Sequence, residues 1–405
     1  MRQNESDISP TLDLLDERAC AYQQCLVFLR QAYPNGAVMT YDHTQARGAE
    51  HVLLAKFVIG VGESEPLWLT YQECSEETTA DNIPGGLRSK VKLLDGTSFQ
   101  ASWYPLHFGR ESLLWEGAAL LHIHSDAPRK FWLKFGAGNI AFMHFSPNQS
   151  MAGAKIDCEQ GSAELSGNTV LIRREERPLV TAVKGSFSDV RIASLEGDFG
   201  RYGTYAVASG TGTDLYAVVG FSEKEERAAE LAGCDPVKEE ERVIRYYDDL
   251  LAQWRIHTPD AALNEAFGHA LLNVEYAWLR PYGWIESIQH WPTMWHMEHT
   301  AAEEWDGRFD RVRECLRSQM QRVFESGAIP DLCPDGSARR DWGGNNQFFF
   351  REVEHYIKMT GDLAFAEEAE PFLEKALWQS FAEYDPVGSG VIGWGTQIGN
   401  QEDFE

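Results

Sequence analysis

The sequence predicts a multidomain β + α protein, in which an N-terminal antiparallel β-sandwich precedes a domain of helical hairpins. Between about residues 37 and 222 the apolar residues recur with a period of two, and from Ser222 onward the period becomes helical. The 405 residues leave room for two or three domains, each with a core of its own. The change of period therefore predicts both the two fold classes and their order.

We expect the N-terminal domain to cover residues 1–222. It begins with a predicted helix from Thr11 to about Tyr33, where apolar residues follow three- and four-residue spacing until Pro34-Asn-Gly. Short β-rich runs separated by Gly, Asn, Ser and Asp then follow, at 51–59, 67–71, 113–124, 131–135, 169–173, 179–183 and 215–221. Many short strands without a long helix between them predict antiparallel sheets packed face to face.

Residues 223–257 form a predicted helical linker with charged faces, and residues 258–405 form predicted helical hairpins. Thr258-Pro-Asp is a strong helix start, because it combines an N-cap hydroxyl, a proline at the first position and an acid in the first turn. After this first helix, the periodicity predicts three more, over about Met294–Phe324, Asn346–Met359 and Leu363–Tyr384.

Charge and composition narrow the classes of partner. A formal net charge of −26 disfavours binding to nucleic acid or to anionic lipid, whereas neutral sugars remain compatible with it. The first ten residues lack an apolar signal-peptide core, and no apolar run is long enough to cross a bilayer. Seven scattered cysteines are typical of reduced thiols. We therefore expect a soluble cytoplasmic protein without nucleic-acid or membrane partners, and we predict no cofactor.

Three predicted loops concentrate aromatic, amide and carboxylate side chains, over residues 281–299, 341–347 and 393–404. If the helices alternate in direction, the three loops can gather at one mouth. Indoles can stack on sugar rings, amides can bond hydroxyl groups, and a carboxylic acid can protonate a departing oxygen. The loops therefore predict a saccharide site.

Three motifs carry a resemblance to a known class: Trp291-Pro-Thr-Met-Trp-His-Met-Glu-His, Glu304-Trp-Asp-Gly-Arg-Phe-Asp and Gly327-Ala-Ile-Pro. In their order and spacing they resemble the six-hairpin glycosidases, nearest to glycoside hydrolase family 63, with trehalases and glycogen-debranching glucosidases as relatives. The resemblance covers about residues 258–405. It implies an α/α-toroid, which 258–405 would supply only in part, and a glycoside hydrolase that inverts the anomeric configuration.

The resemblance also implies roles for particular residues. The general acid of the family lies in a turn after the fourth helix, which here contains Asp403, with Glu402 beside it. The general base of the resembled enzymes lies in later hairpins, so residues 258–405 do not supply it. The family has Trp-Asp where this chain has Trp295-His296, which removes an expected sugar-binding carboxylate and leaves Glu298 or Glu286 as substitutes. The predicted sugar contacts are Trp291, Trp295, His296, Glu298, Trp342, Asn346, Gln347, Trp394 and Gln397.

Several alternatives stay open on the sequence alone. One is a non-catalytic carbohydrate-binding or scaffold protein, and another is a disaccharide phosphorylase of the same architecture. His296-x-x-His299 with Glu303 has the spacing of a helical metal pair, and His122 and His124 would share one strand face. Sugar or backbone hydrogen bonds and an exposed sheet face explain these histidines, so we predict no metal. An incomplete toroid would leave apolar helix faces without covering neighbours, such as those that carry Phe348, Val353 and Leu373, and such exposed faces predict self-association.

Overall fold

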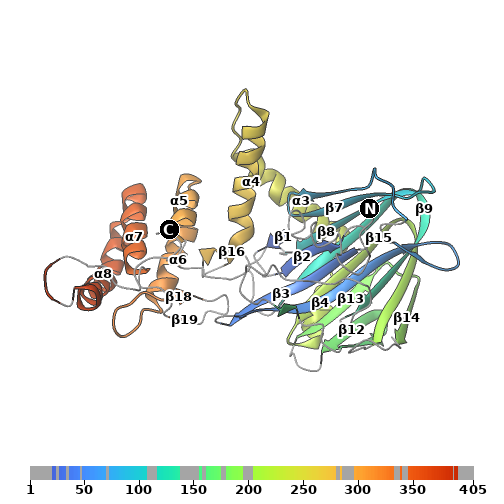
Figure 1. Cartoon of the computed structure of the whole chain (residues 1–405), viewed down its shortest axis with the longest axis horizontal. Coiled ribbons are helices and arrows are strands. Elements are labelled where there is room, and N and C mark those ends of the chain that lie inside the picture. The colour runs from blue at the N-terminus through green and yellow to red at the C-terminus, as the bar shows by residue number, and fades with distance from the viewer. Residues whose placement is uncertain are drawn as a thin grey trace, which may run out of the picture. The chain divides into compact units, whose positions relative to one another are not determined.

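A computed structural model of the chain describes residues 21–23, 27–32, 36–45, 48–69, 73–106, 116–136, 155–156, 161–174, 179–194, 204–279, 283–284, 296–332, 338–339, 345–385 and 387–390 (Figure 1). The chain divides into two compact units. The first, here the sheet unit, comprises Met1–His43 and Glu50–Gly268, and the second, the helical unit, comprises Thr44–Ala49 and His269–Glu405. The domain boundaries predicted at residues 222 and 257 stay predictions.

The sheet unit holds one connected sheet followed by two helices, α2 (Glu225–Ala232) and α3 (Pro236–Gln253). Its strands are β1 (Ala21–Gln23), β2 (Val27–Ala32), β3 (Gly36–Gln45), β4 (Gly48–Val61), β5 (Leu67–Trp68), β6 (Thr79–Ile83), β7 (Gly86–Lys92), β8 (Ser98–Leu106), β9 (Glu116–Gly136), β10 (Lys155–Ile156), β11 (Gly161–Ser166), β12 (Thr169–Arg174), β13 (Val180–Gly185), β14 (Asp189–Ser194) and β15 (Thr204–Ser222).

Two long strands, β9 and β15, pair with each other and organise the whole sheet. The first half of β9 pairs with β8 and its second half pairs with β4, so the partner changes partway along the strand. Similarly, the first half of β15 pairs with β14 and its last residues pair with β13. The strands therefore fall into two groups that share β9 and β15.

The apolar core lies where side chains of these two groups meet. Phe57 of β4 lies edge-on to Trp103 of β8, with ring centroids 5.4 Å apart, and both side chains are buried. Phe99 of β8 makes a similar contact with Phe131 in the second half of β9, at 5.3 Å. Burying each of these rings stabilises the fold by about 1.5–3 kcal/mol. These contacts join the two strand groups of one connected sheet, and the predicted sandwich of two sheets packed face to face stays a prediction.

Two details of the sheet differ from the sequence prediction. The predicted helix from Thr11 to Tyr33 is wrong over residues 21–23 and 27–32, where β1 and β2 form an antiparallel pair, and residues 11–20, 24–26 and 33 lie outside the described part of the chain. Antiparallel pairing of β2 with β1 and with β3 holds the backbone extended here, and in an extended strand alternate side chains share a face. The pairing in the sheet therefore outweighs the three- and four-residue spacing that predicted a helix. One pairing is also parallel: β10 joins β4 through Lys155 and Ile156.

Helices α2 and α3 follow β15 directly, as the charged periodic pattern after Ser222 predicts. Asp235 caps α3 by accepting a hydrogen bond from Lys238 N, and Pro236 occupies the first helical position. Helix α2 packs very close to β15, since a Cβ atom at Gly220 would lie only 2.4 Å from Ala228 O. Only a glycine at position 220 allows this approach.

The helical unit contains α4 (Ala261–Ala277), whose first residues belong to the sheet unit, and then α5 (His296–Trp305), α6 (Phe309–Met320), α7 (Asn345–Thr360) and α8 (Leu363–Tyr384). Two small hairpins accompany them, β16 (Trp278–Leu279) with β17 (Gly283–Trp284), and β18 (Asp331–Leu332) with β19 (Ala338–Arg339).

The single helix predicted over residues 294–324 is wrong, because Asp306-Gly-Arg divides it into α5 and α6. Gly307 has a φ of 75°, in the left-handed region, and its N–H donates to Glu304 O. The N–H of Arg308 donates to Glu303 O, so the last carbonyls of α5 are satisfied by a glycine C-cap. The apolar period continues through this turn and conceals it in the sequence.

Contacts between helices show that their directions alternate. Arg313, early in α6, contacts Asp362, which follows the end of α7, whereas Gln319, at the end of α6, contacts Glu352 in the middle of α7. Helices α6 and α7 are therefore antiparallel. The start of α7 likewise meets the end of α8 through Asn346 and Gln379.

The shared core contains Trp278, Trp284, Val312, Cys315, Leu316, Met320, Ile329, Phe349, Val353, Tyr356, Phe365, Ala369 and Ala376. The prediction that Val353 lacks covering neighbours is wrong, since it is fully buried there.

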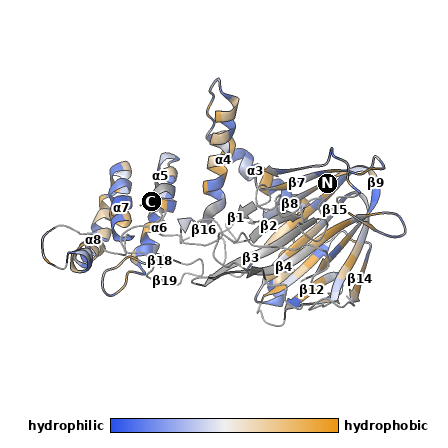
Figure 2. Ribbon diagram, viewed as in Figure 1, coloured by the Kyte–Doolittle hydropathy of each residue, from blue (hydrophilic) through white to orange (hydrophobic). Residues whose placement is uncertain are grey.

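Hydropathy follows this packing, with apolar and polar residues on different faces of α6 and α7 (Figure 2). Within the described residues, none of the helices combines the length and the hydropathy that crossing a bilayer would need.

Candidate functional site

The candidate site is defined by the ends of α5 to α8 that neighbour the aromatic-rich loops in sequence. Loop 281–299 ends at the start of α5, loop 341–347 ends at the start of α7, and loop 393–404 follows α8. Since neighbouring helices are antiparallel, these positions share one end of the layer, which we call the loop end. Ile329 N after α6 donates to Asn346 Oδ1 at 2.8 Å, which joins the exit of α6 to the start of α7. We call the opposite end, which holds Asp306-Gly-Arg, the turn end.

Most of the residues predicted to carry chemistry lie outside the described residues. These are Trp291, Trp295, Trp342, Trp394, Gln397, Glu402 and Asp403, together with Glu286. His296 and Glu298 lie in the first turn of α5, at the loop end, and only their backbone is described. The role of each of these residues in binding or catalysis stays a prediction.

Asn346 and Gln347 are neighbours at the start of α7 but have different surroundings. The Asn346 amide donates to Gln379 Oε1 at 2.6 Å, to Ala376 O at 2.9 Å and to Ser380 Oγ at 3.0 Å, and it is buried. Its side chain therefore ties α7 to α8. Gln347 is exposed, so its amide can meet a ligand at the loop end.

Two tryptophans that the sequence did not single out support the loop before α5. Trp284 is buried, packs on Trp278 with centroids 4.8 Å apart, and stacks on the His299 ring at 5.8 Å and 13°. This contact fixes His299 against β17. Glu303, the third member of the conceivable metal set around His296 and His299, bonds Arg311 instead, at 3.2 Å.

The helical core also holds a buried carboxyl group, Glu352 of α7, which no sequence pattern singled out. Burial raises its pKa to about 8, opposed by the hydrogen bond that Gln319 Nε2 donates at 3.3 Å and assisted by the nearby Glu304. Glu304 contacts the ring of His355, and burial raises the pKa of Glu304 as well. A neutral acid suits a proton donor, but Glu352 lies two turns inside α7 and is buried, so it serves the core.

At the turn end, two acids and two arginines form what we call the arginine cluster: Glu275, Glu303, Arg308 and Arg311. The Glu275 carboxylate is buried, contacts Arg308, and accepts hydrogen bonds from Arg311 at 2.7 and 3.0 Å. Burial raises the pKa of Glu303, and the two guanidinium groups oppose this shift. The cluster joins α4, α5 and α6, and its position away from the loop end indicates a structural role.

Comparison with solved structures places the fold in a class. A bacterial glucoamylase complexed with acarbose matches with a TM-score of 0.56 and 12% identity, over 91% of this chain and 58% of that one. A putative kojibiose phosphorylase from the human microbiome matches with a TM-score of 0.57 and 11% identity, over 89% of this chain and 56% of that one. No protein-family model and no curated sequence matches the chain.

These likenesses show that the chain shares its fold, antiparallel β-structure followed by α-helices, with these two enzymes. The resemblance of the sequence motifs to glycoside hydrolase family 63 stays a prediction. The chain spans a little over half the length of the two enzymes that it matches.

Proposed function

We propose that the chain belongs to a carbohydrate-active enzyme that hydrolyses an oligosaccharide or glycoside with inversion at the anomeric carbon. The observation that carries this proposal is the likeness to the glucoamylase over 91% of the chain. The common loop end of α5 to α8 supports it, because three loops rich in indoles, amides and carboxylates join the helices there. Among such enzymes we place it nearest to glycoside hydrolase family 63, on the motifs around Trp291, Glu304 and Gly327.

Asp403 is the proposed proton donor to the departing glycosidic oxygen, with Glu402 as the alternative. Trp394 would hold the face of the sugar, and Gln397 would bond its hydroxyl groups. In an inverting enzyme a second carboxylate about 6.5–9.5 Å away activates the attacking water. We assign that base to hairpins of the complete enzyme beyond residues 258–405, since the chain spans 58% of the glucoamylase.

The test is Asp403→Asn in the full-length protein. We expect hydrolysis of a natural oligosaccharide to fall by about 10²–10⁴-fold, the usual contribution of a positioned acid. Aryl glycosides with good leaving groups should lose much less, since their departure needs little help from a proton. Equal losses on both substrates would contradict the role of donor, and full activity together with an inactive Glu402→Gln variant would transfer it to Glu402.

A disaccharide phosphorylase is the second candidate, because the putative kojibiose phosphorylase matches the chain with a TM-score of 0.57. The two reactions differ in the nucleophile and can be separated directly. A hydrolase releases free sugar at the same rate with or without inorganic phosphate, whereas a phosphorylase requires phosphate and forms a sugar phosphate. Binding of oligosaccharide without any turnover would favour the third reading, a carbohydrate-binding protein.

We also propose a cytoplasmic location. The described cysteines Cys74 and Cys234 are free thiols, as is usual in a reducing compartment. Burial raises the pKa of Cys74 and of Cys234 to about 11, so both thiols remain protonated and unreactive at neutral pH. Fractionation of the native cells would test this location.

A further inference from the structure

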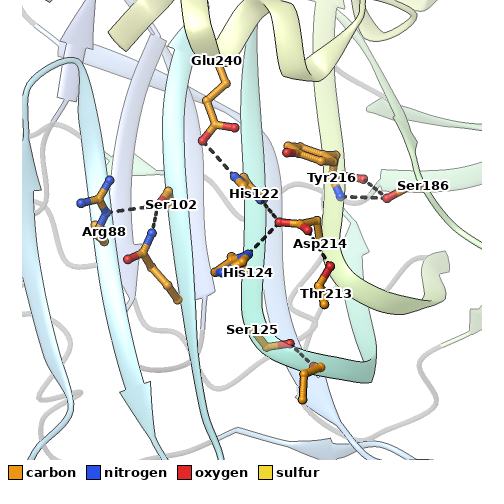
Figure 3. A network of polar contacts seen from close by, with 12 residues as sticks. Arg88, Ser102, His122, His124, Ser125, Ser186, Thr213, Asp214, Tyr216 and Glu240 are labelled. Carbon is orange, nitrogen blue, oxygen red and sulfur yellow. Dashed lines mark hydrogen bonds and ion pairs between the residues drawn. The ribbon is translucent and has the colours of Figure 1, made fainter. Parts of the chain in front are cut away.

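The sheet unit carries a second cluster of two acids and two nitrogen side chains, which we call the histidine cluster: His122, His124, Asp214 and Glu240 (Figure 3). His122 and His124 project from one face of β9. Asp214 of β15 pairs with His124 across the two strands, directly after a register shift between Gly212 and Asp214. The bulge and the pairing register bring Asp214 onto the face that carries both imidazoles.

The ligand atoms converge on a small volume. Asp214 Oδ1 lies 2.9 Å from His122 Nε2 and 2.8 Å from His124 Nδ1. The candidate ligand atoms of these three residues all lie within 4.8 Å of one another, and among the described residues no other group of three or more His, Cys, Asp or Glu residues does so. Ligands on one tetrahedral Zn²⁺, each at about 2.0–2.2 Å, are separated by about 3.3 Å. Small side-chain rotations are therefore enough to admit an ion.

Each side of the cluster is also held by an outer partner. Glu240 of α3 lies 2.9 Å from His122 Nδ1, so it can accept that N–H and direct the Nε2 lone pair toward Asp214. Thr213 Oγ1 donates to Asp214 Oδ2 at 2.7 Å, which leaves Oδ1 directed at the imidazoles. Tyr216 stacks on the His122 ring, with centroids 4.2 Å apart. Such outer carboxylate and hydroxyl partners are typical of metal-binding histidines and carboxylates.

We propose that His122 Nε2, His124 Nδ1 and Asp214 Oδ1 form a binding site for a divalent transition metal, with Zn²⁺ as the best fit. Two imidazoles and one carboxylate suit Zn²⁺ or a similar ion, whereas Mg²⁺ and Ca²⁺ prefer sites made of oxygen alone. His124 and Asp214 are partly open to solvent, with side-chain exposures of 47% and 38%, so water can complete the coordination. Glu240 is a positioning residue in this site.

The bound ion would act as a structural clamp. His124 is the last residue of β9 that pairs with β8 and with the second half of β15, and Glu240 connects the site to α3. The ion would therefore join both shared strands and one helix near the place where the strands change partners. This role is independent of the proposed glycosidase reaction, so the two proposals fail separately.

Zn²⁺ binding to metal-stripped protein, measured in competition with a chelating dye, tests the site. We expect one Zn²⁺ per chain and an increase in Tm on binding. His124→Ala and Asp214→Asn should each weaken the affinity at least tenfold, and Glu240→Gln should weaken it by about 10–100-fold. The control His257→Ala removes an exposed histidine outside the cluster and should bind like the parent.

Three results would overturn the proposal. One is a parent protein that binds Zn²⁺ no more tightly than the double variant His122→Ala/His124→Ala. Another is a loss of affinity in His257→Ala equal to that in His124→Ala, which would indicate binding by scattered histidines. The third is unchanged affinity in a folded Asp214→Asn. Because His124 is half exposed, its alanine variant should fold, and its far-ultraviolet circular dichroism should match that of the parent.

Discussion

The arginine cluster and the histidine cluster each contain two carboxylates and two nitrogen side chains, yet the structure uses them differently. In the helical unit, Glu275 and Glu303 are buried and lie against Arg308 and Arg311. In the sheet unit, the corresponding partners are imidazoles and one carboxylate is partly exposed. The nitrogen partner is thus the main chemical difference between the two clusters.

That difference decides what each cluster can bind. A guanidinium keeps its protons in proteins and offers no lone pair, so arginines can neutralise acids but cannot ligate a metal. An imidazole can give up a proton and present a nitrogen lone pair to an ion. A buried carboxylate–arginine cluster is therefore complete in itself, whereas a solvent-accessible carboxylate–imidazole cluster can accept a further cation.

The largest expected effect tests this completeness. Arg311→Leu leaves Glu275 and Glu303 buried with one guanidinium fewer, and the free energy of unfolding should fall by about 3–5 kcal/mol. The matched control is Arg313→Leu, on the same helix, where the partners Asp310 and Asp362 lie at 2.9 and 3.6 Å and Asp310 is exposed. That surface pair should contribute at most about 1 kcal/mol. Urea denaturation measures both, and equal losses would contradict the distinction.

Glu352 provides an intermediate case, a buried acid with an amide partner in place of a cation. Its pKa is about 8 in the folded chain against 4.5 as the ordinary value, so the folded state binds more protons between these pH values. Stability should therefore fall as pH rises from about 5 to 8, because each pKa unit corresponds to about 1.4 kcal/mol. The loss should be on the order of a few kcal/mol.

Thermal unfolding across pH compares Glu352→Gln with the parent. The variant should lose most of this pH dependence and be the more stable of the two at pH 8. Glu354→Gln is the control on the same helix, since Glu354 is exposed and pairs with Lys358 at the surface. A Glu352→Gln profile parallel to that of the parent would show that the carboxyl group is ionised in the folded core.

The smallest effect concerns the turn that assembles the arginine cluster. In Gly307→Ala the new Cβ would meet nothing within 4 Å, so only the positive φ of 75° costs free energy, about 1–2 kcal/mol. Gly327→Ala should cost more, because its φ is 99° and the Cβ would lie 2.6 Å from Lys375 O. Chemical denaturation of both variants ranks the two costs, and the reverse order would show that the turn at Gly307 is held by more than its backbone.

The periodicity of the sequence predicted the two fold classes and their order, but not two local features. Residues 21–23 and 27–32 belong to a stretch with helical spacing, yet their pairing in the sheet decides their conformation. Asp306-Gly-Arg contains the signal for a helix end, but the apolar positions before and after it continue one period. Val312, Leu316 and Met320 then belong to a second helix that folds back on the first.

The sequence predicted the three loops of the candidate site by composition, and the described helix ends that neighbour these loops in sequence lie at one end of the helical layer. It could not indicate the neutral Glu352, because the burial that raises its pKa comes from helices distant in sequence. For the histidine cluster, the two-residue spacing of His122 and His124 was visible. Asp214 lies about ninety residues later, and only the register of β9 with β15 and the bulge bring it near.

The pairing of β9 with β15 also has a consequence for folding kinetics. Phe135 pairs with Ala206, so the ribbon that both strand groups share closes a loop of about seventy residues. Closing such a loop costs chain entropy before neighbouring strands can repay it, and proteins with contacts this distant fold in milliseconds to seconds or more slowly. Neither strand group can be completed first, because β9 and β15 belong to both. The sheet unit should therefore fold in one slow cooperative step, with amide protons on both sides exchanging together.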